Sequence, residues 1–194
     1  MRLKIVQVGE SVLRGQARSL TPGEIASDEI RRLIRDMRET MHDAPGVGLA
    51  APQVGIPLQL AVIEDKEEYW KGILPEELEE RERRSVAFQV IVNPVITASS
   101  EKTADFFEGC LSLAGFSAVV PRAHSVRVEC LDERGQPRTI NASGWYSRIL
   151  QHEIDHLHGN LYIDRMRCRT FMSLDNFARF WKGKPVGEIR GQLE

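Results

Sequence analysis

The sequence predicts an α+β fold built mainly of antiparallel sheet. Two observations favour it: strand-like segments follow one another in runs, and the two clearest helical patterns stand apart from those runs instead of alternating with them. A length of 194 residues, 42% of them hydrophobic, suits one domain with a sizeable core. We therefore expect residues 1–194 to form a single domain, with sheets around a central helix and an amphipathic helix near the N-terminus.

The first helical pattern covers residues 27–42. Ser27, its first residue, is a candidate N-cap, and charged side chains fill one face. The apolar side chains recur at helical spacing, at Ile30, Leu33, Ile34, Met37 and Met41. This spacing is typical of an amphipathic helix on the surface of a globular protein.

A loop rich in glycine and proline follows at 44–57, and a strand is expected at 58–64. Residues 66–85 are dense in charge, which predicts a surface insertion carrying a short exposed helix. A docking surface for a partner is one interpretation of this insertion. A solvated excursion without such a role is the interpretation we favour.

Strand patterns dominate the next part of the chain, and a hairpin turn is expected at 132–135. The predicted strands cover 89–97, 103–107, 118–120, 125–131 and 137–141. A second helix is predicted from near Ser143 to Gly159, where glycine ends it. A short strand at 161–163 and a short helix over 174–181 complete the prediction, the latter within a C-terminal segment at 166–194.

The second helix carries the motif His152-Glu153-Ile154-Asp155-His156. Residues four apart share one face of a helix, so His152 and His156 can present two imidazoles to one metal ion. Glu153 is then close enough to reach a water on that ion without being a ligand, as zinc-dependent hydrolysis requires. Trp145 and Ile149 extend the same face as an apolar wall. A helix whose histidines bind nothing is the alternative.

The third ligand decides the kind of site. A metzincin would need histidine at position 162, where this sequence has Tyr162. A downstream carboxylate would have to come from residues that lack an acidic helical context, namely Asp164, Asp175 and Glu188. Cys110 is the better candidate, because a thiolate with two imidazoles leaves one coordination position open for chemistry.

The residues beside Cys110 support this choice. Gly109 lets the backbone turn sharply before the cysteine, and Glu108 offers a carboxylate behind the ligands. The other two cysteines, Cys130 and Cys168, are expected to be buried structural thiols.

The glycine-rich stretch 46–51 fits the pattern G-x-G-x-x-A of dinucleotide-binding loops. That motif needs a strand before the glycines and a helix after them, whereas here a helix precedes and prolines follow. We reject nucleotide binding on this ground. Gln53, just after the loop, is a candidate donor to an oxyanion through its side-chain amide.

Three stretches together resemble the peptide deformylases: "GVGLAAPQ" (46–53), "EGCLS" (108–112) and "QHEIDH" (151–156). The similarity runs from about residue 3 to residue 166, and "ASGW…RILQHE" further resembles the subgroup that includes organellar enzymes. The resemblance implies a peptide-deformylase-like catalytic domain. Its activity would be metal-dependent hydrolysis of the formyl group from the N-terminal formylmethionine of newly synthesised polypeptides, with release of formate.

The resemblance also implies roles for individual residues. Cys110, His152 and His156 would hold one divalent ion, Fe²⁺ in many members and Zn²⁺ or Ni²⁺ in others. Glu153 would act as general base and then as acid, while Gln53 and the backbone N–H of Leu111 would stabilise the oxyanion. The remaining implied roles are backbone contacts to the peptide from Gly48 and Gly109, and an ion pair of Glu108 with Arg122 behind the cysteine.

Peptide recognition can be placed on three further residues. Val47, beside Gly48, can pair with the substrate as an added strand, which reads the backbone and tolerates varied side chains. Trp145 and Ile149 lie two turns and one turn before His152, where they can form an apolar slot for the methionine side chain.

Two alternatives remain open at this point. A zinc-dependent endopeptidase would share the helix, the metal and the base. The second alternative is a binding protein without catalytic activity, whose metal is structural. In such a protein Glu153 and Gln53 would have no function in catalysis.

The net charge, the cysteine count and the absence of long apolar runs limit the partners and the cellular compartment that we expect for this protein. A formal net charge of −2 gives no electrostatic footprint for nucleic acid or an anionic membrane, and no apolar run approaches about 18 residues. Three cysteines and no visible signal or transit peptide favour the cytoplasm, with a processed organellar form as the alternative. The expected partners are formylmethionine N-termini of nascent chains, with transient ribosome association.

Overall fold

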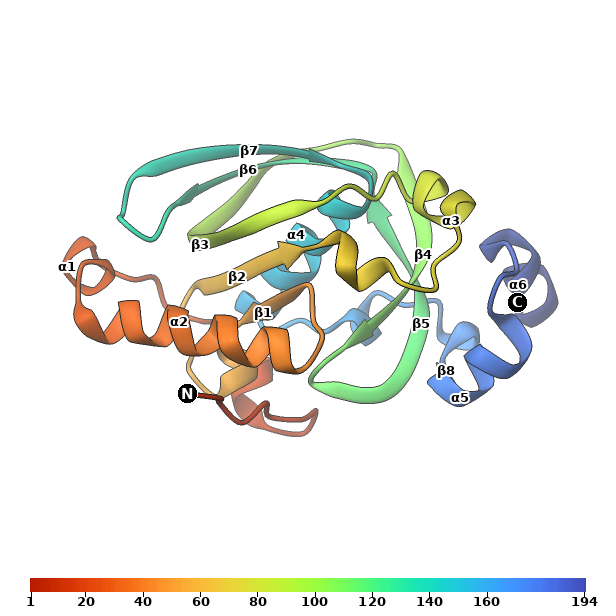
Figure 1. Cartoon of the computed structure of the whole chain (residues 1–194), viewed down its shortest axis with the longest axis horizontal. Coiled ribbons are helices and arrows are strands. Elements are labelled where there is room, and N and C mark those ends of the chain that lie inside the picture. Colours follow the sequence, from red (N-terminus) through yellow and green to blue (C-terminus); the bar gives the residue numbers. More distant parts are fainter.

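Two antiparallel sheets surround one central helix, α4 (Figure 1). The structure, a computed structural model, describes residues 1–194. One sheet has the strand order β1-β2-β3-β6-β7 and the other β4-β5-β8, and every pairing between these strands is antiparallel. The strands are β1 (Gly48–Ala50), β2 (Leu60–Asp65), β3 (Val86–Ser99), β4 (Thr103–Cys110), β5 (Leu113–Ala123), β6 (Ser125–Leu131), β7 (Pro137–Ser143) and β8 (Met172–Ser173). The predicted mixture of helices and antiparallel sheet is confirmed.

The hairpin of β6 and β7 follows from local sequence. Buried and exposed residues alternate along β6, and the strands pair without interruption from Ser125 opposite Ser143 to Leu131 opposite Pro137. At the turn, the Asp132 carboxylate accepts hydrogen bonds from two following backbone N–H groups, and Gly135 adopts a positive φ. β2 is instead buried along its whole length, consistent with its four apolar residues at 60–63, and the two acidic residues at its end are buried as well.

Helix α2 (Asp28–Asp43) begins where the sequence places its cap, since the Ser27 side chain accepts a hydrogen bond from the Ile30 N–H. Its apolar face packs on β2 and β3 in a shared core with Leu60 and Val92. The one-turn helix α1 (Pro22–Ile25) precedes it, closed by a capping box between Thr21 and Glu24.

Helix α4 (Gly144–Leu157) runs through the middle of the molecule, with the larger sheet curving over it (Figure 1). Leu150, Ile154 and Leu157 bury one face of the helix against residues of β2, β3, β6 and β7. The opposite face therefore points toward β4 and β5, and that is the face on which the motif histidines lie.

Residues 66–85 form two short helical pieces, a 3₁₀ turn at Glu67–Trp70 and helix α3 (Pro75–Glu80). Neither piece contains a buried residue, as expected of a solvated excursion. The C-terminal end of the segment differs, because Arg83 is buried and its guanidinium donates two hydrogen bonds to the Asp65 carboxylate. The segment is thus anchored to the end of β2.

Two predictions after α4 are wrong. Residues 162–164 form a 3₁₀ turn, not a strand, because the Asp164 carboxylate accepts the Leu161 N–H at 2.7 Å and closes the turn locally. Cys168 is exposed, whereas Cys130 is buried in β6 as expected. Cys168 lies in another 3₁₀ turn, Cys168–Thr170, in which only the last residue is buried.

The C-terminal segment packs on the outer face of the β4–β5 hairpin (Figure 1). It forms α5 (Leu174–Asn176), a π-helical stretch (Phe177–Trp181) and α6 (Val186–Leu193), the last of which was not predicted. Phe177 contacts Phe107 with ring centroids 4.8 Å apart, while Phe180 remains half exposed. None of the helices combines the length and the apolar character that a membrane crossing needs.

Candidate metal centre

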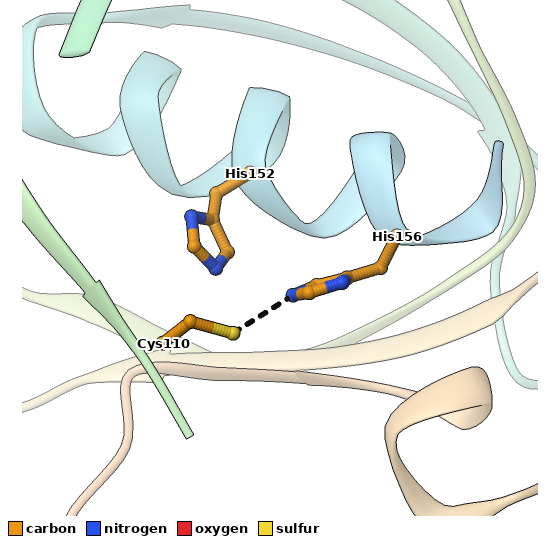
Figure 2. A group of neighbouring side chains, drawn as sticks. All are labelled: Cys110, His152 and His156. Carbon is orange, nitrogen blue, oxygen red and sulfur yellow. Dashed lines mark hydrogen bonds between the residues drawn. The ribbon is translucent and has the colours of Figure 1, made fainter. Parts of the chain in front are cut away.

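Three potential ligand side chains meet between α4 and the end of β4 (Figure 2). His152 and His156 lie four residues apart on α4, and their ring centroids are 4.9 Å apart. Cys110 ends β4, and its Sγ lies 3.3 Å from Nε2 of His156. One sulfur and two ring nitrogens thus lie within 4.8 Å of one another.

The approach of Cys110 to the helix depends on an irregularity in the β4–β5 hairpin. The strands pair regularly up to Glu108 opposite Ala118, and the register then shifts before Cys110, which lies opposite Leu113. Gly109 occupies the shift, and a β-carbon there would lie 3.4 Å from the Phe116 carbonyl oxygen. This irregularity of the hairpin lies directly before Cys110, whose thiol reaches the two histidines.

Behind the histidines, Glu108 is the centre of a buried polar cluster. Its carboxylate accepts hydrogen bonds from Arg122 at 2.9 Å and from Arg148 at 2.6 Å, and its Oε2 lies 3.0 Å from Nδ1 of His152. Burial alone would raise the pKa of Glu108, but the charge of Arg122 and the hydrogen bonds from His152 and Arg122 hold it well below its ordinary value. The expected ion pair of Glu108 and Arg122 is present.

The ionised carboxylate of Glu108 determines which ring nitrogen of His152 carries a proton. A carboxylate only accepts hydrogen bonds, so Nδ1 of His152 carries the proton and Nε2 is left to face Cys110. Burial lowers the pKa of His152, but its contacts with Cys110 and Glu108 outweigh that effect and raise it. Burial and the charge of His152 lower the pKa of His156, so its ring stays neutral.

These residues fit a divalent metal ion. One thiolate and two imidazoles are donors that zinc and other first-row transition metals accept, and three protein ligands leave a position open. The hydrogen bond from His152 to Glu108 fixes the ring in the orientation that a ligand needs, in the manner of the carboxylate–histidine pairs of known metal sites. A raised pKa at His152 means that protons compete with the ion for this ring.

Glu153 lies beside the three ligands and is only 3% exposed. Its Oε2 has no hydrogen-bond partner, and desolvation by burial raises the pKa of Glu153 to about 7. A carboxyl group with a pKa near neutrality can both take up and release a proton. Its position is limited by Gly48 of β1, where a β-carbon would lie 2.2 Å from Oε1 of Glu153.

A pocket of about 430 Å³ opens over this centre. The sequence-predicted residues that line it are Val47, Gly48, Gln53, Glu108, Gly109, Cys110, Leu111, Trp145, Ile149, His152 and Glu153. His156 and Arg122 lie behind the lining, both almost fully buried. The Gln53 amide donates to Sγ of Cys110 at 3.5 Å and to Ser112 Oγ at 3.4 Å, while its oxygen accepts the Ala50 N–H.

The sequence did not single out several residues that the structure brings to this site. Arg148 hydrogen-bonds to Glu108 and also donates to the carbonyl oxygens of Val120 and Ala104. Its position four residues before His152 on the same helix was the signal that could have revealed it. Phe116 and Leu174 also line the pocket, and no local sequence pattern connects either to the motif residues.

The fold and this group of side chains define an α+β protein able to hold one metal ion on a cysteine and two histidines. The chain belongs to the polypeptide deformylase family, whose family model matches residues 2–171. It is 51% identical over 173 residues to peptide deformylase 1A, chloroplastic/mitochondrial, of Arabidopsis thaliana, covering 89% of this chain and 64% of that protein. It is 42% identical to peptide deformylase 1 of Bifidobacterium longum, covering 95% of this chain and 82% of that protein.

The fold of this chain is similar to that of solved peptide deformylase structures. The class I type b peptide deformylase from Acinetobacter baumannii with Met-Ala-Ser bound has a TM-score of 0.76 and 30% identity, covering 86% of this chain and 99% of that chain. The chain spans 64% of the length of the Arabidopsis relative, so that relative has further sequence outside the shared part.

Proposed function

We propose that this protein removes the formyl group from the N-terminal formylmethionine of newly synthesised polypeptides and releases formate. The observation that carries the proposal is a buried carboxylate, Glu153, beside the Cys110–His152–His156 group at the base of an apolar pocket. Membership of the polypeptide deformylase family supports it. So does the Met-Ala-Ser bound to the Acinetobacter baumannii relative, because this peptide has the form of a deformylated product.

Cys110, His152 and His156 would hold one divalent ion, which we propose to be Fe²⁺, with Zn²⁺ or Ni²⁺ as alternatives. When bound, such an ion polarises a carbonyl oxygen and lowers the pKa of a water ligand from 15.7 to about 7. The buried Glu108–Arg122–Arg148 cluster holds Nδ1 of His152 and so fixes the orientation of that ligand.

Glu153 moves the protons of the reaction. It takes a proton from the attacking water, whose oxygen forms the new bond to the formyl carbon, and gives a proton to the peptide nitrogen as the C–N bond breaks. The products are formate and a free amino terminus. Burial of Glu153, which raises its pKa to about 7, suits a group with both tasks.

Hydrogen-bond donors from two other elements complete the proposed machinery. The Gln53 side-chain amide and the Leu111 backbone N–H would stabilise the negative charge that develops on the formyl oxygen. The Gln53 amide is held in place by its bond to the Ala50 N–H, so its donor end faces Cys110. A group that is already oriented stabilises charge without reorganising during the reaction.

The apolar part of the pocket would bind the peptide. Val47 and Gly48 would pair with its backbone from β1, and Gly109 would contact it from the opposite hairpin. Trp145 and Ile149 would surround the methionine side chain. The wider proposal is a single catalytic domain over residues 1–194 that meets nascent chains in the cytoplasm, with transient ribosome association, or in an organelle.

Formate release is the direct test. The purified protein, loaded with Fe²⁺ under anaerobic conditions, should release formate from formyl-Met-Ala-Ser and leave casein intact. Cleavage of casein without formate release would instead support the endopeptidase alternative. A protein that retains the metal but does neither would support the silent binding protein.

A further inference from the structure

The charged segment 66–85 meets the start of α4 at very short range. The backbone N–H of Trp145 donates a hydrogen bond to the backbone carbonyl oxygen of Arg81 at 2.9 Å. At Gly144, a β-carbon would lie 2.5 Å from Cβ of Glu82 and 2.9 Å from the Arg81 oxygen, and φ there is +57°. Only glycine permits this approach, so the end of the segment and the helix start fit together as one unit.

Guanidinium groups surround the indole ring of Trp145. The Cζ atoms of Arg81 and Arg83 lie 5.1 and 5.2 Å from the ring centroid, and that of Arg148 lies 5.9 Å away. These distances are within the range of cation–π attraction. The indole N–H is buried and has no hydrogen-bond partner, so no polar contact of the ring itself fixes its orientation.

The two arginines from the segment are held in different ways. Arg83 forms a paired hydrogen bond with Asp65 at 2.7 and 2.9 Å, and Asp65 also accepts from the indole of Trp70. Arg81 forms one ion pair, with Glu77 at 3.7 Å, and the charge of Glu80 also acts on it, but burial lowers the pKa of its guanidinium overall. Two aromatic rings also lie beside the Arg81 guanidinium, and Trp145 at 5.1 Å is nearer than Phe106 at 5.8 Å.

Trp145 lines the pocket over the metal centre, whereas Arg81 and Arg83 lie outside that lining. We infer that Arg81 and Arg83 are positioning residues that hold the Trp145 ring as a wall of the pocket. The segment 66–85 then sets how tightly the pocket grips the first side chain of the peptide. This inference takes the identity of the peptide from the proposed function, but the support of the ring does not depend on it.

Steady-state kinetics of Arg81→Ala tests the consequence for the substrate. With formyl-Met-Ala-Ser we expect KM to rise about five- to tenfold while kcat stays within about twofold, because a loosened wall weakens binding and leaves the chemistry intact. With formyl-Gly-Ala-Ser, which has no side chain to grip, kcat/KM should not change. Arg81→Lys keeps a cation near the ring and should restore most of the loss.

The matched control is Arg84→Ala, which removes the same charge from an exposed side chain three positions further on. It should behave as the unsubstituted protein with both peptides. The inference would be overturned if Arg81→Ala lost the same fraction of kcat/KM with both peptides. Equal effects of Arg81→Ala and Arg84→Ala on kcat/KM would also overturn it.

A second measurement does not need activity. The chain has three tryptophans and therefore three indole N–H signals in a nitrogen-15 NMR spectrum, and Trp145→Phe identifies the one from Trp145. We expect that signal to shift and broaden in Arg81→Ala, or in Arg81→Gln if the alanine variant folds poorly, and to stay unchanged in Arg84→Ala. An unchanged signal in folded Arg81 variants refutes the support of the ring. Absence of formate release by the unsubstituted protein would refute the proposed function alone.

Discussion

At Gly48, a β-carbon would lie 2.2 Å from Oε1 and 2.8 Å from Cγ of Glu153, closer than unbonded atoms approach. The backbone of β1 thus lies directly against the buried carboxylate. The strand proposed to pair with the peptide is also the surface that fixes the position of the proposed base. A single glycine therefore links substrate binding to proton transfer.

Gly48→Ala should reduce formate release about 10²-fold, because the added methyl group displaces the Glu153 carboxylate by a distance that catalysis does not tolerate. Metal content should be unchanged, since the three atoms nearest to an added β-carbon all belong to Glu153, which is not a ligand. Gly187→Ala in α6, where a β-carbon meets nothing within 4 Å, is the matched control. Full activity of Gly48→Ala would show that Glu153 can move without consequence.

Glu153→Gln keeps the size of the side chain and removes its capacity to accept a proton. We expect kcat to fall by about 10²–10⁴-fold, the usual contribution of general acid–base catalysis, with the metal retained. Glu129→Gln, at an exposed position of β6, should have no effect. Substantial activity in Glu153→Gln would remove this residue from the mechanism.

Cys110→Ser replaces a thiolate by a hydroxyl group, which is a much weaker ligand for transition metals. After dialysis against a chelator, elemental analysis should show a lower metal content than in the unsubstituted protein. Cys168→Ser serves as the control because that thiol is exposed and does not belong to the group of three potential ligands. Equal metal retention in both variants would contradict the ligand assignment.

The parts of the fold that local sequence could predict are those that local interactions determine. The strand 125–131 was predicted with its observed bounds, because alternation and the Asp132 turn act within a few residues. The strand expected at 161–163 was wrong, because the Asp164 side chain closes a turn that hydrophobicity alone does not reveal. The C-terminal π-helical stretch and α6 depend on packing against Phe107, a contact remote in sequence.

The same distinction applies to the site. The motif spacing places His152, Glu153 and His156 on one helix. Comparison of the possible third ligands favours Cys110, and the resemblance to the deformylases implies the same residue. The helical spacing of Arg148 from His152 indicates a shared face, but its partner Glu108 lies 40 residues away in the sequence. The partner of Arg83, Asp65, lies 18 residues away, and no short pattern predicts that contact. For this reason the segment 66–85 was interpreted as a solvated excursion along its whole length.

Arg148→Met should destabilise the protein by about 3 kcal/mol, because it removes one of the donors to the buried Glu108 carboxylate and the donor to the carbonyl oxygens of Val120 and Ala104. Urea unfolding at neutral pH measures the difference. Arg127→Met, at an exposed position in β6, should change the free energy of unfolding by less than about 0.5 kcal/mol. Equal effects of both substitutions would show that the Glu108 cluster tolerates the loss of Arg148.

Glu64, at the end of β2, ties α2 to the loop that leads into the pocket. Its buried carboxylate pairs with His42 and lies 3.4 Å from Arg38 and 3.5 Å from Lys66, while its N–H donates to the Val47 carbonyl oxygen. Burial raises the pKa of Glu64, but the hydrogen bond and charge of His42, with the charges of Lys66 and Arg38, lower it overall.

A carboxyl group whose pKa is lower in the folded than in the unfolded state stabilises the fold above its unfolded pKa, about 4.3 for glutamate. That contribution disappears as the pH falls through the lower, folded pKa. Glu64→Gln should therefore be less stable than the unsubstituted protein at about pH 5.5, and the two should converge toward about pH 3 in urea unfolding experiments. A difference that stays constant over this range would show that the charge of Glu64 contributes nothing to the attachment of the loop.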